Sequence, residues 1–192
     1  TTDKIKDQYY TLIGKFDVFI DSAAIFLTES TTEVINGIVN TDPDKFNNNT
    51  QIIYLDDTDT IISRENNYLT NFTGFTPGKK YFIFFDNSHI VGTDIPNQPN
   101  DLTGLISITP NSKFTDISQG IFRLRKMNMG QTIQFLMVHN YMDTLPTTRN
   151  ILLETARRND NNYKELTKSK QYIQYIKYLK RDNNKIASFI EP

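Results

Sequence analysis

The stretch that decides the fold runs from Lys113 to Val138 and reads KFTDISQGIFRLRKMNMGQTIQFLMV. In its first half apolar residues recur at spacings of three and four, which predicts a helix over 113–126 with one apolar stripe. Gly130 ends this segment, and the apolar run at 131–138 behind the glycine predicts a short buried strand. A helix that leads into a buried strand is one unit of an α/β sheet.

Three positively charged side chains follow the apolar stripe: Arg123, Arg125 and Lys126. On a helix that continues through this segment, Gln119, Arg123 and Lys126 lie one turn apart, on a face rotated from the stripe. A cationic helix that enters an α/β core from a loop suits the binding of a polyanion, such as a triphosphate or a nucleic-acid backbone. The alternative is that the cations simply solvate the outer face of the helix.

Outside this stretch, the clearest strand is the apolar run at 81–85, because a central strand of a parallel sheet is buried on both faces. The polar segment 86–94 follows it directly, at the position where open α/β sheets place their ligands. A Ser-Thr-Thr-Glu run at 30–33 has the pattern of a capping box and predicts a helix behind it. We therefore expect a three-layer α/β domain with a mainly parallel sheet. The further expected elements are strands at 16–20, 51–55 and 104–109, and a helix at 32–39.

A hairpin is expected in the middle of the chain. The acidic turn at 56–59 joins the strand at 51–55 to a second short strand at 60–63. Such a turn could bind a cation, but a solvated hairpin tip is the simpler expectation. The segment 64–80 has no sustained periodicity and predicts an irregular connector.

Composition narrows the class of function. The chain has 192 residues with 21 basic and 22 acidic side chains, so any phosphate site must be a local patch. It has no cysteine, which excludes disulfides and a cysteine nucleophile, and its two histidines are too few for a histidine-based metal site. We see no signal peptide and no membrane-spanning run, so the expected location is the cytoplasm, with no membrane partner.

The expected domain organisation has three parts. Residues 1–15 form an N-terminal lead-in, 16–139 form the α/β lobe, and 140–192 form a linker and a basic helical tail. The tail helix is amphipathic and rich in lysine and tyrosine. We expect it to pack its apolar face on a domain; contact with RNA or an anionic membrane is the alternative.

Two motifs resemble those of a known superfamily. The sequence His-Ile-Val-Gly-Thr-Asp at 89–94, followed by a strand and then by Gln119-x-x-x-Arg123, a glycine and another strand, resembles motifs V and VI in the second RecA-like lobe of superfamily-two helicases. Motif VI there reads Gln-x-x-Gly-Arg-x-Gly-Arg. This chain departs from it: Phe122 replaces a glycine, Lys126 replaces the last arginine, and Arg125 is additional.

A closer resemblance is to very large eukaryotic proteins that carry paired domains of unknown function and are labelled ubiquitinyl hydrolases. Their pattern is Asp-x-x-His-x-x-Gly-Thr-Asp followed by Gln-x-x-x-Arg-x-Arg-Lys-x-x-x-Gly-Gln, and similar proteins occur in giant DNA viruses. The resemblance covers about residues 16–138. Eleven residues fit the pattern in register: Asp86, His89, Gly92, Thr93, Asp94, Gln119, Arg123, Arg125, Lys126, Gly130 and Gln131.

The resemblance implies a function in an NTPase of two lobes. Arg123, with Arg125 or Lys126, would reach the γ-phosphate of ATP and stabilise the charge that develops during hydrolysis. Four residues would couple the nucleotide to a nucleic-acid track: Gly92, Thr93, Asp94 and Gln119. The partner is then the first RecA-like lobe, and ATP and magnesium bind only when that lobe is present.

The chain alone is expected to be inactive as an ATPase. It has no Gly-x-x-x-x-Gly-Lys-[Ser/Thr] phosphate loop, and the nearest candidate, at 76–80, precedes a strand instead of a helix. Asn87 stands where a catalytic glutamate would be needed, and the absence of cysteine excludes a thiol isopeptidase. The alternative function is a non-catalytic α/β interaction module of a large protein, which would be viral if the giant-virus resemblance applies.

Overall fold

The computed structural model describes residues 2–66, 68–109 and 112–138, together with 156–158, 161, 162, 164, 165, 167, 168 and 170. The described residues between 156 and 170 are helical. Most of the expected linker and tail, and His139, lie outside the described residues.

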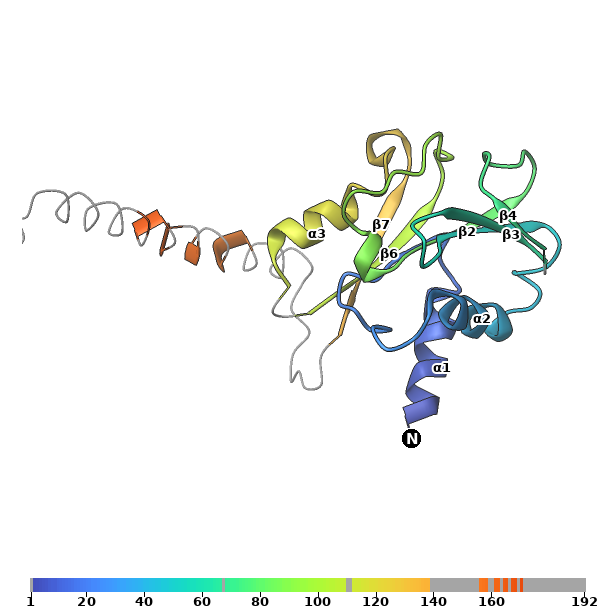
Figure 1. Ribbon diagram of the computed structural model, residues 1–192, viewed down its shortest axis with the longest axis horizontal. Coiled ribbons are helices and arrows are strands. Elements are labelled where there is room, and N and C mark those ends of the chain that lie inside the picture. The colour runs from blue at the N-terminus through green and yellow to red at the C-terminus, as the bar shows by residue number, and fades with distance from the viewer. Residues whose placement is uncertain are drawn as a thin grey trace, which may run out of the picture.

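The described part forms an α/β domain with one seven-stranded sheet, in the order β4-β3-β2-β5-β1-β6-β7 (Figure 1). Five strands are parallel: β1 (Val18–Ile20), β2 (Thr50–Leu55), β5 (Lys80–Phe85), β6 (Thr103–Ile108) and β7 (Thr132–Met137). Two strands at one end of the sheet are antiparallel to their neighbours: β3 (Ile61–Glu65), which pairs with β2, and β4 (Tyr68–Asn71), which forms the edge. The prediction of a mainly parallel α/β sheet is confirmed, with β5 and β6 paired on either side of β1.

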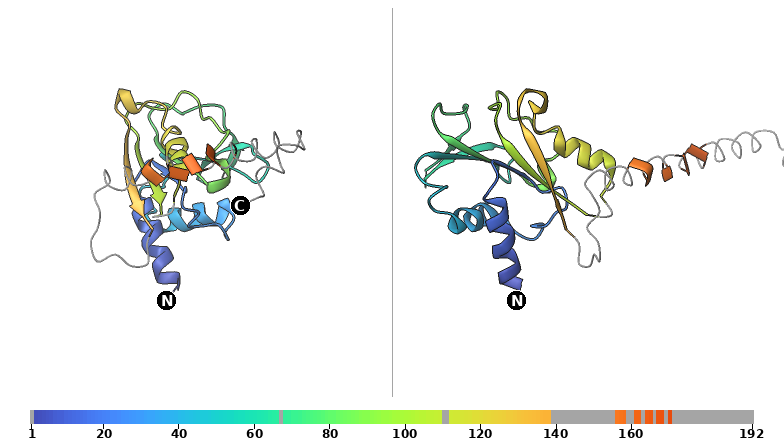
Figure 2. Two further views of the ribbon diagram at one scale, coloured as in Figure 1. Left: turned by 90° about the vertical axis from the view of Figure 1, so that its left-hand side faces the viewer. Right: turned by 180° about the vertical axis from the view of Figure 1, so that it is seen from behind.

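Helices cover both faces of the sheet. Alternate side chains of each strand face opposite sides, so that Phe19 of β1 joins one core cluster and Ile20 joins the other. The first face is covered by α1 (Thr2–Ile13) and α2 (Thr31–Thr41), and the second by α3 (Phe114–Ile121) and the buried residues of the loop before β6 (Figure 2).

The start of α2 is fixed by its own sequence. The Ser30 hydroxyl accepts a hydrogen bond from the Glu33 N–H at 3.3 Å, and the Glu33 carboxylate accepts one from the Ser30 N–H at 2.8 Å. These bonds form the predicted capping box and satisfy two N–H groups that a helix end leaves unpaired.

Helix α1 lies within the expected lead-in, yet it is part of the domain. Ile13 is fully buried and Tyr10 is 8% exposed in the core cluster under α2. The Tyr10 ring stacks on Phe26 with a centroid distance of 5.2 Å, and its hydroxyl donates to the Glu29 carboxylate. The first fifteen residues therefore contribute core, although the pattern of apolar residues there is short.

The predicted helix over 113–126 is too long. Helix α3 ends at Ile121, and the chain continues in tight turns, with a 3-10 turn at Met127–Met129. The reason is a tertiary contact: Leu124 is 3% exposed and lies so close to Gly104 of β6 that a Cβ there would be 2.7 Å from a Leu124 methyl carbon. A continued helix would carry Leu124 away from this contact.

The predicted connector at 64–80 is wrong in about its first half, because β3 extends to Glu65 and β4 occupies 68–71. Asn66 turns the chain between the two strands with φ of 56°, a conformation that asparagine tolerates better than most residues. The remaining residues up to Lys79 carry no helix or strand.

Replacing Gly37 by alanine should destabilise the protein by about 1–3 kcal/mol, although this change in a helix ordinarily stabilises by about 1 kcal/mol. A Cβ at this position would lie 2.4 Å from the Tyr10 ring, which is held by its stacking on Phe26 and its bond to Glu29. Urea unfolding of Gly37→Ala and of Asn40→Ala, an exposed control in the same helix, checks it. Equal stability of the two variants would contradict the packing of α1 on α2.

Candidate functional site

Three aspartates follow three parallel strands directly: Asp21 after β1, Asp56 after β2 and Asp86 after β5. Because these strands are parallel, their carboxyl ends meet at one edge of the sheet, where α/β proteins bind ligands. A cavity of about 360 Å³ lies there, lined by Asp21, Asp86 and residues before and at the start of α2. We call it the carboxyl-edge cavity.

Asp21 organises the chain at this edge and is only 2% exposed. Its carboxylate accepts hydrogen bonds from the N–H groups of Ile25 and Phe26, at 2.9 and 3.1 Å, and from the Ser107 hydroxyl at 2.8 Å. Burial raises the pKa of Asp21, and these three hydrogen bonds offset part of the rise. Its first role is therefore structural: it fixes the turn after β1 and ties that turn to β6.

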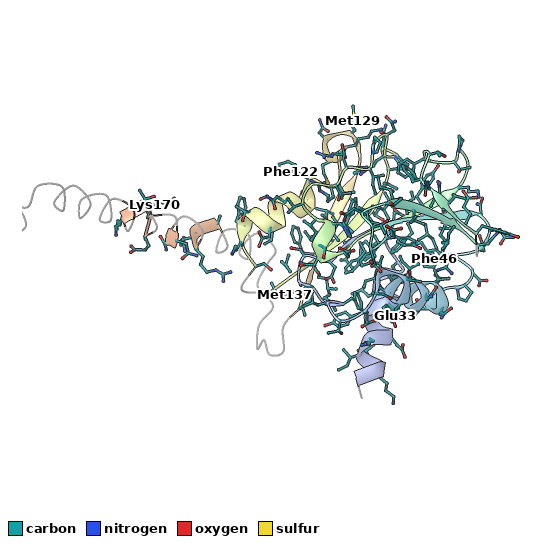
Figure 3. All side chains as sticks on the ribbon, in the orientation of Figure 1. Glu33, Phe46, Phe122, Met129, Met137 and Lys170 are labelled. Carbon is teal, nitrogen blue, oxygen red and sulfur yellow. The ribbon has the colours of Figure 1, made fainter. Side chains whose placement is uncertain are left out.

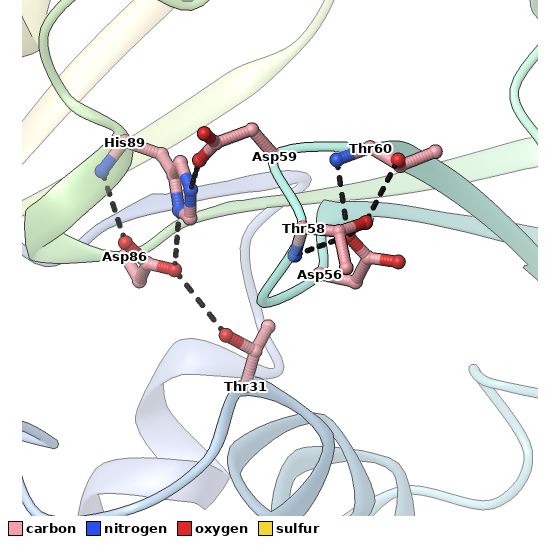
Figure 4. A network of polar contacts seen from close by, with 7 residues as sticks. All are labelled: Thr31, Asp56, Thr58, Asp59, Thr60, Asp86 and His89. Atoms are coloured by element: carbon pink, nitrogen blue, oxygen red, sulfur yellow. Dashed lines mark hydrogen bonds and ion pairs between the residues drawn. The ribbon is translucent and has the colours of Figure 1, made fainter.

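His89 lies between two carboxylates beside the cavity (Figure 4). Its Nδ1 is 2.7 Å from Oδ2 of Asp86 and its Nε2 is 2.8 Å from Oδ1 of Asp59. Burial lowers the pKa of His89, but the hydrogen bonds and charges of Asp86 and Asp59 outweigh burial, so the pKa is raised above its ordinary value. Thr31, in the first turn of α2, donates to the same Asp86 oxygen at 3.2 Å.

The turn at 56–60 is held by Asp56. One oxygen of its carboxylate accepts from the N–H groups of Thr58 and Thr60, at 2.9 and 3.0 Å, and from the Thr58 hydroxyl at 2.7 Å. These bonds lower the pKa of Asp56. The acidic turn predicted between β2 and β3 is thus an internally braced unit, and Asp59 is the residue through which it contacts His89.

The structure brings together two segments that the sequence singled out separately. The Nε of Arg125 lies 2.8 Å from Oδ1 of Asp94, with both side chains about half exposed. Burial lowers the pKa of Arg123, and the neighbouring charge of Arg125 lowers it further, while Asp94 raises it. A guanidinium remains charged at neutral pH, so two positive charges meet beside one carboxylate. Of the cations that the sequence singled out in this segment, Arg125 is the one that forms an ion pair with Asp94.

Two buried glutamines position the backbone of the arginine segment. The Gln98 side chain donates to the Arg123 carbonyl at 2.7 Å and accepts from the Arg125 N–H at 3.3 Å. The Gln131 side chain accepts from the Lys126 N–H at 2.7 Å and donates to Gln98 at 3.2 Å. Gln98 and Gln131 are 1% and 2% exposed, so these bonds form without competition from water.

The remaining predicted site residues lie around this pair of segments. Gly92, with φ of 84°, and the half-buried Thr93 line a second cavity of about 530 Å³, which Asp94 also lines. Gln119 is exposed on α3, and its carbonyl accepts from the Arg123 side chain at 3.4 Å. Lys126 is half-buried between Arg125 and the 3-10 turn.

Exposed apolar side chains occur in the segments that carry the arginines and Asp94. Phe122 is 64% exposed and Met129 is 63% exposed on the segment that follows α3 (Figure 3), and Val91 beside Gly92 is 62% exposed. Scattered exposed apolar residues are ordinary on protein surfaces. Here two of them, Phe122 and Met129, belong to the same segment as Arg123 and Arg125.

Sequence reasoning missed Asp21, Asp59 and Gln98. Asp21 could have been found, because it follows the first strand in the same way as Asp86 follows β5, and the same rule about strand ends applies to both. The acidic turn at 56–59 was predicted, but nothing in the local sequence indicates that Asp59 contacts His89 or that Gln98 contacts Arg123. These partners lie 30 and 25 residues away.

Among the described residues, no three or more histidine, aspartate or glutamate side chains are grouped so as to hold a metal ion. No helix in the described part of the chain is long and apolar enough to cross a membrane. No known protein family, curated protein or solved structure matches the chain.

Proposed function

We propose that this chain is the second, RecA-like lobe of a two-lobe NTPase and contributes cations to a phosphate site that the first lobe completes. The observation that carries the proposal is the contact between Arg125 and Asp94, with Arg123 beside them. A carboxylate that holds an arginine by a charge-assisted hydrogen bond keeps it in place until a phosphate replaces the carboxylate.

The placement of the cations supports a site shared with a partner. Arg125 is about half exposed, and its backbone is fixed by Gln98, so the side chain is accessible while its base is rigid. The exposed Phe122 and Met129 on the same segment give a second protein lobe apolar surface to cover. The same two side chains favour the second candidate, an interaction module that binds a protein partner without nucleotide.

Polyanion binding distinguishes the two candidates. ATP or a single-stranded oligonucleotide should bind the isolated chain with a Kd of roughly millimolar, since a few exposed ion contacts provide only a few kcal/mol. The double variant Arg123→Ala/Arg125→Ala should weaken binding about tenfold, and added salt should weaken binding to the wild type. A titration followed by NMR or calorimetry measures both effects.

The control is Lys4→Ala/Lys113→Ala, which removes the same charge from two exposed positions elsewhere. It should bind like the wild type. Asp94→Ala should bind more tightly, because it frees Arg125 and removes a negative charge, whereas the exposed Asp116→Ala should change little. If all variants bound the polyanion equally and without dependence on salt, the proposed phosphate site would be contradicted. The interaction module would then be the remaining candidate.

The isolated chain should show no ATP turnover, because the cations leave the triphosphate without a phosphate loop. Turnover above background that disappeared in Arg123→Ala would show that the chain is a complete enzyme and would contradict the two-lobe proposal.

A further inference from the structure

Both ring nitrogens of His89 contact carboxylate oxygens, at 2.7 Å for Asp86 and 2.8 Å for Asp59 (Figure 4). An ionised carboxylate has no hydrogen to donate. Both contacts are therefore hydrogen bonds only when each ring nitrogen carries a hydrogen, which is the imidazolium cation. A neutral ring can supply one of the two bonds, and the other contact would then set a nitrogen lone pair against a carboxylate oxygen.

The surroundings of His89 favour that cation. The β2–β3 turn, the end of β1, the segment before α2 and the loop after β5 all present carboxylates to the cavities on its two sides, and among the described residues no lysine or arginine lines either cavity. The charge of His89 also acts on Asp56. The acidic residues concerned are Asp21, Glu29, Asp56, Asp57, Asp59, Asp86 and Asp94. Of these, Glu29 is paired with Lys6 and Asp94 with Arg125.

The two partners of His89 are held very differently. Asp86 is 22% exposed, and its carboxylate also accepts from the His89 N–H at 3.0 Å and from the Thr31 hydroxyl at 3.2 Å. Asp59 is 86% exposed and has φ of 59° at the tip of the turn. A neutral ring that keeps its bond to Asp86 therefore gives up Asp59.

We infer that His89 is a protonation-controlled latch: its cation ties the turn at 56–60 to Asp86 and closes the carboxyl-edge cavity, and loss of the proton releases the turn. The turn moves as one unit, because Asp56 braces it internally through Thr58 and Thr60. The latch is built from acidic side chains and His89, not from the arginine segment, and it does not depend on phosphate binding.

Release of the turn changes what the edge of the sheet can admit. The carboxyl-edge cavity of about 360 Å³ and the neighbouring cavity of about 530 Å³ share Asp59, Ser88 and His89 in their walls. Withdrawal of Asp59 removes part of the common wall. The latch thus controls access to the edge at which parallel α/β sheets bind ligands.

The sign of the pH dependence follows from the raised pKa of His89. The latch is complete below the pKa of an unfolded histidine, and its contribution to stability is lost as the pH rises through the higher pKa of the folded state. The turn is accordingly closed on the acidic side and released on the basic side.

NMR on the full chain tests the latch cleanly, because the chain has only two histidines. In a His139→Ala background, the His89 ring should titrate above the ordinary histidine pKa. An NOE between its ring hydrogens and the Asp59 Hβ should be present below the midpoint and lost above it. The amide signals of residues 57–60 should shift with the same midpoint.

Two variants of the turn separate the latch from general charge effects. Asp59→Asn should lower the midpoint of His89 and remove the matching shift of the turn amides, while Asp57→Asn should preserve both the NOE and the matched shift. An NOE that persisted above the midpoint, or turn amides that did not follow His89, would overturn the inference. Similar behaviour of the two variants would do so as well.

Discussion

Replacing Phe19 by alanine should lower the free energy of unfolding by about 4 kcal/mol, the largest effect we expect from a single substitution. Phe19 lies in β1, an interior strand that pairs with β5 and β6, and is fully buried. Its ring stacks on Phe84 of β5 with a centroid distance of 5.7 Å and meets Phe26 edge-on at 6.2 Å. Alanine removes these contacts and leaves a cavity between this face of the sheet and the segments that cover it.

Urea unfolding of Phe19→Ala and of Phe122→Ala measures this loss against a matched control. The same truncation at the 64% exposed Phe122 should change stability by less than about 0.5 kcal/mol. A comparable loss at both positions would contradict the burial of Phe19 in the core.

Replacing Asp21 by alanine should cost about 3 kcal/mol, the second largest effect. The change leaves the N–H groups of Ile25 and Phe26 without their acceptor and deprives the Ser107 hydroxyl of a partner. Each buried donor without a partner costs roughly 1–3 kcal/mol, and relief of a desolvated charge offsets part of the sum. Urea unfolding measures the loss of stability in Asp21→Ala. The control is Asp57→Ala, which changes an exposed aspartate on the same cavity.

The pH dependence of stability gives a second test of Asp21. Because its pKa is raised in the folded state, the native protein keeps the proton at pH values where the unfolded chain has lost it. The contribution of Asp21 to stability therefore falls as the pH rises from its ordinary pKa through the folded value. The difference in stability between wild type and Asp21→Ala should shrink over that window. A difference that grew with pH would show that the carboxylate form is the one the fold favours.

Elements whose causes are local could be predicted from the sequence. The apolar run of β5 and the capping box of α2 each depend on residues within one segment, and both formed where predicted. The end of α3 could not be predicted, because it depends on Leu124 packing against Gly104, twenty positions earlier in the chain. Strand β4 was missed because its four residues are all exposed, so no alternation marks them.

In the candidate site, too, some features could be predicted from the sequence and others depend on contacts between distant segments. Similarity to a family pattern singled out Asp94 and the arginine segment, and the fold brings them together. Which cation meets Asp94 depends on the backbone path after α3, and that path is set by Gln98 and Gln131 across the loop. A backbone path that is set by hydrogen bonds to side chains distant in the sequence leaves no periodic pattern by which it could be predicted.

Strand β4 has a consequence for handling the protein at high concentration. It ends the sheet, and its side chains Tyr68 and Leu69 are 79% and 58% exposed. Natural edge strands are commonly guarded by a lysine, a proline or a bulge, and residues 68–71 contain neither of these residue types. The unpaired backbone of β4 offers a template for strand addition between molecules, so self-association in concentrated samples should begin at this edge, far along the sheet from the arginine segment.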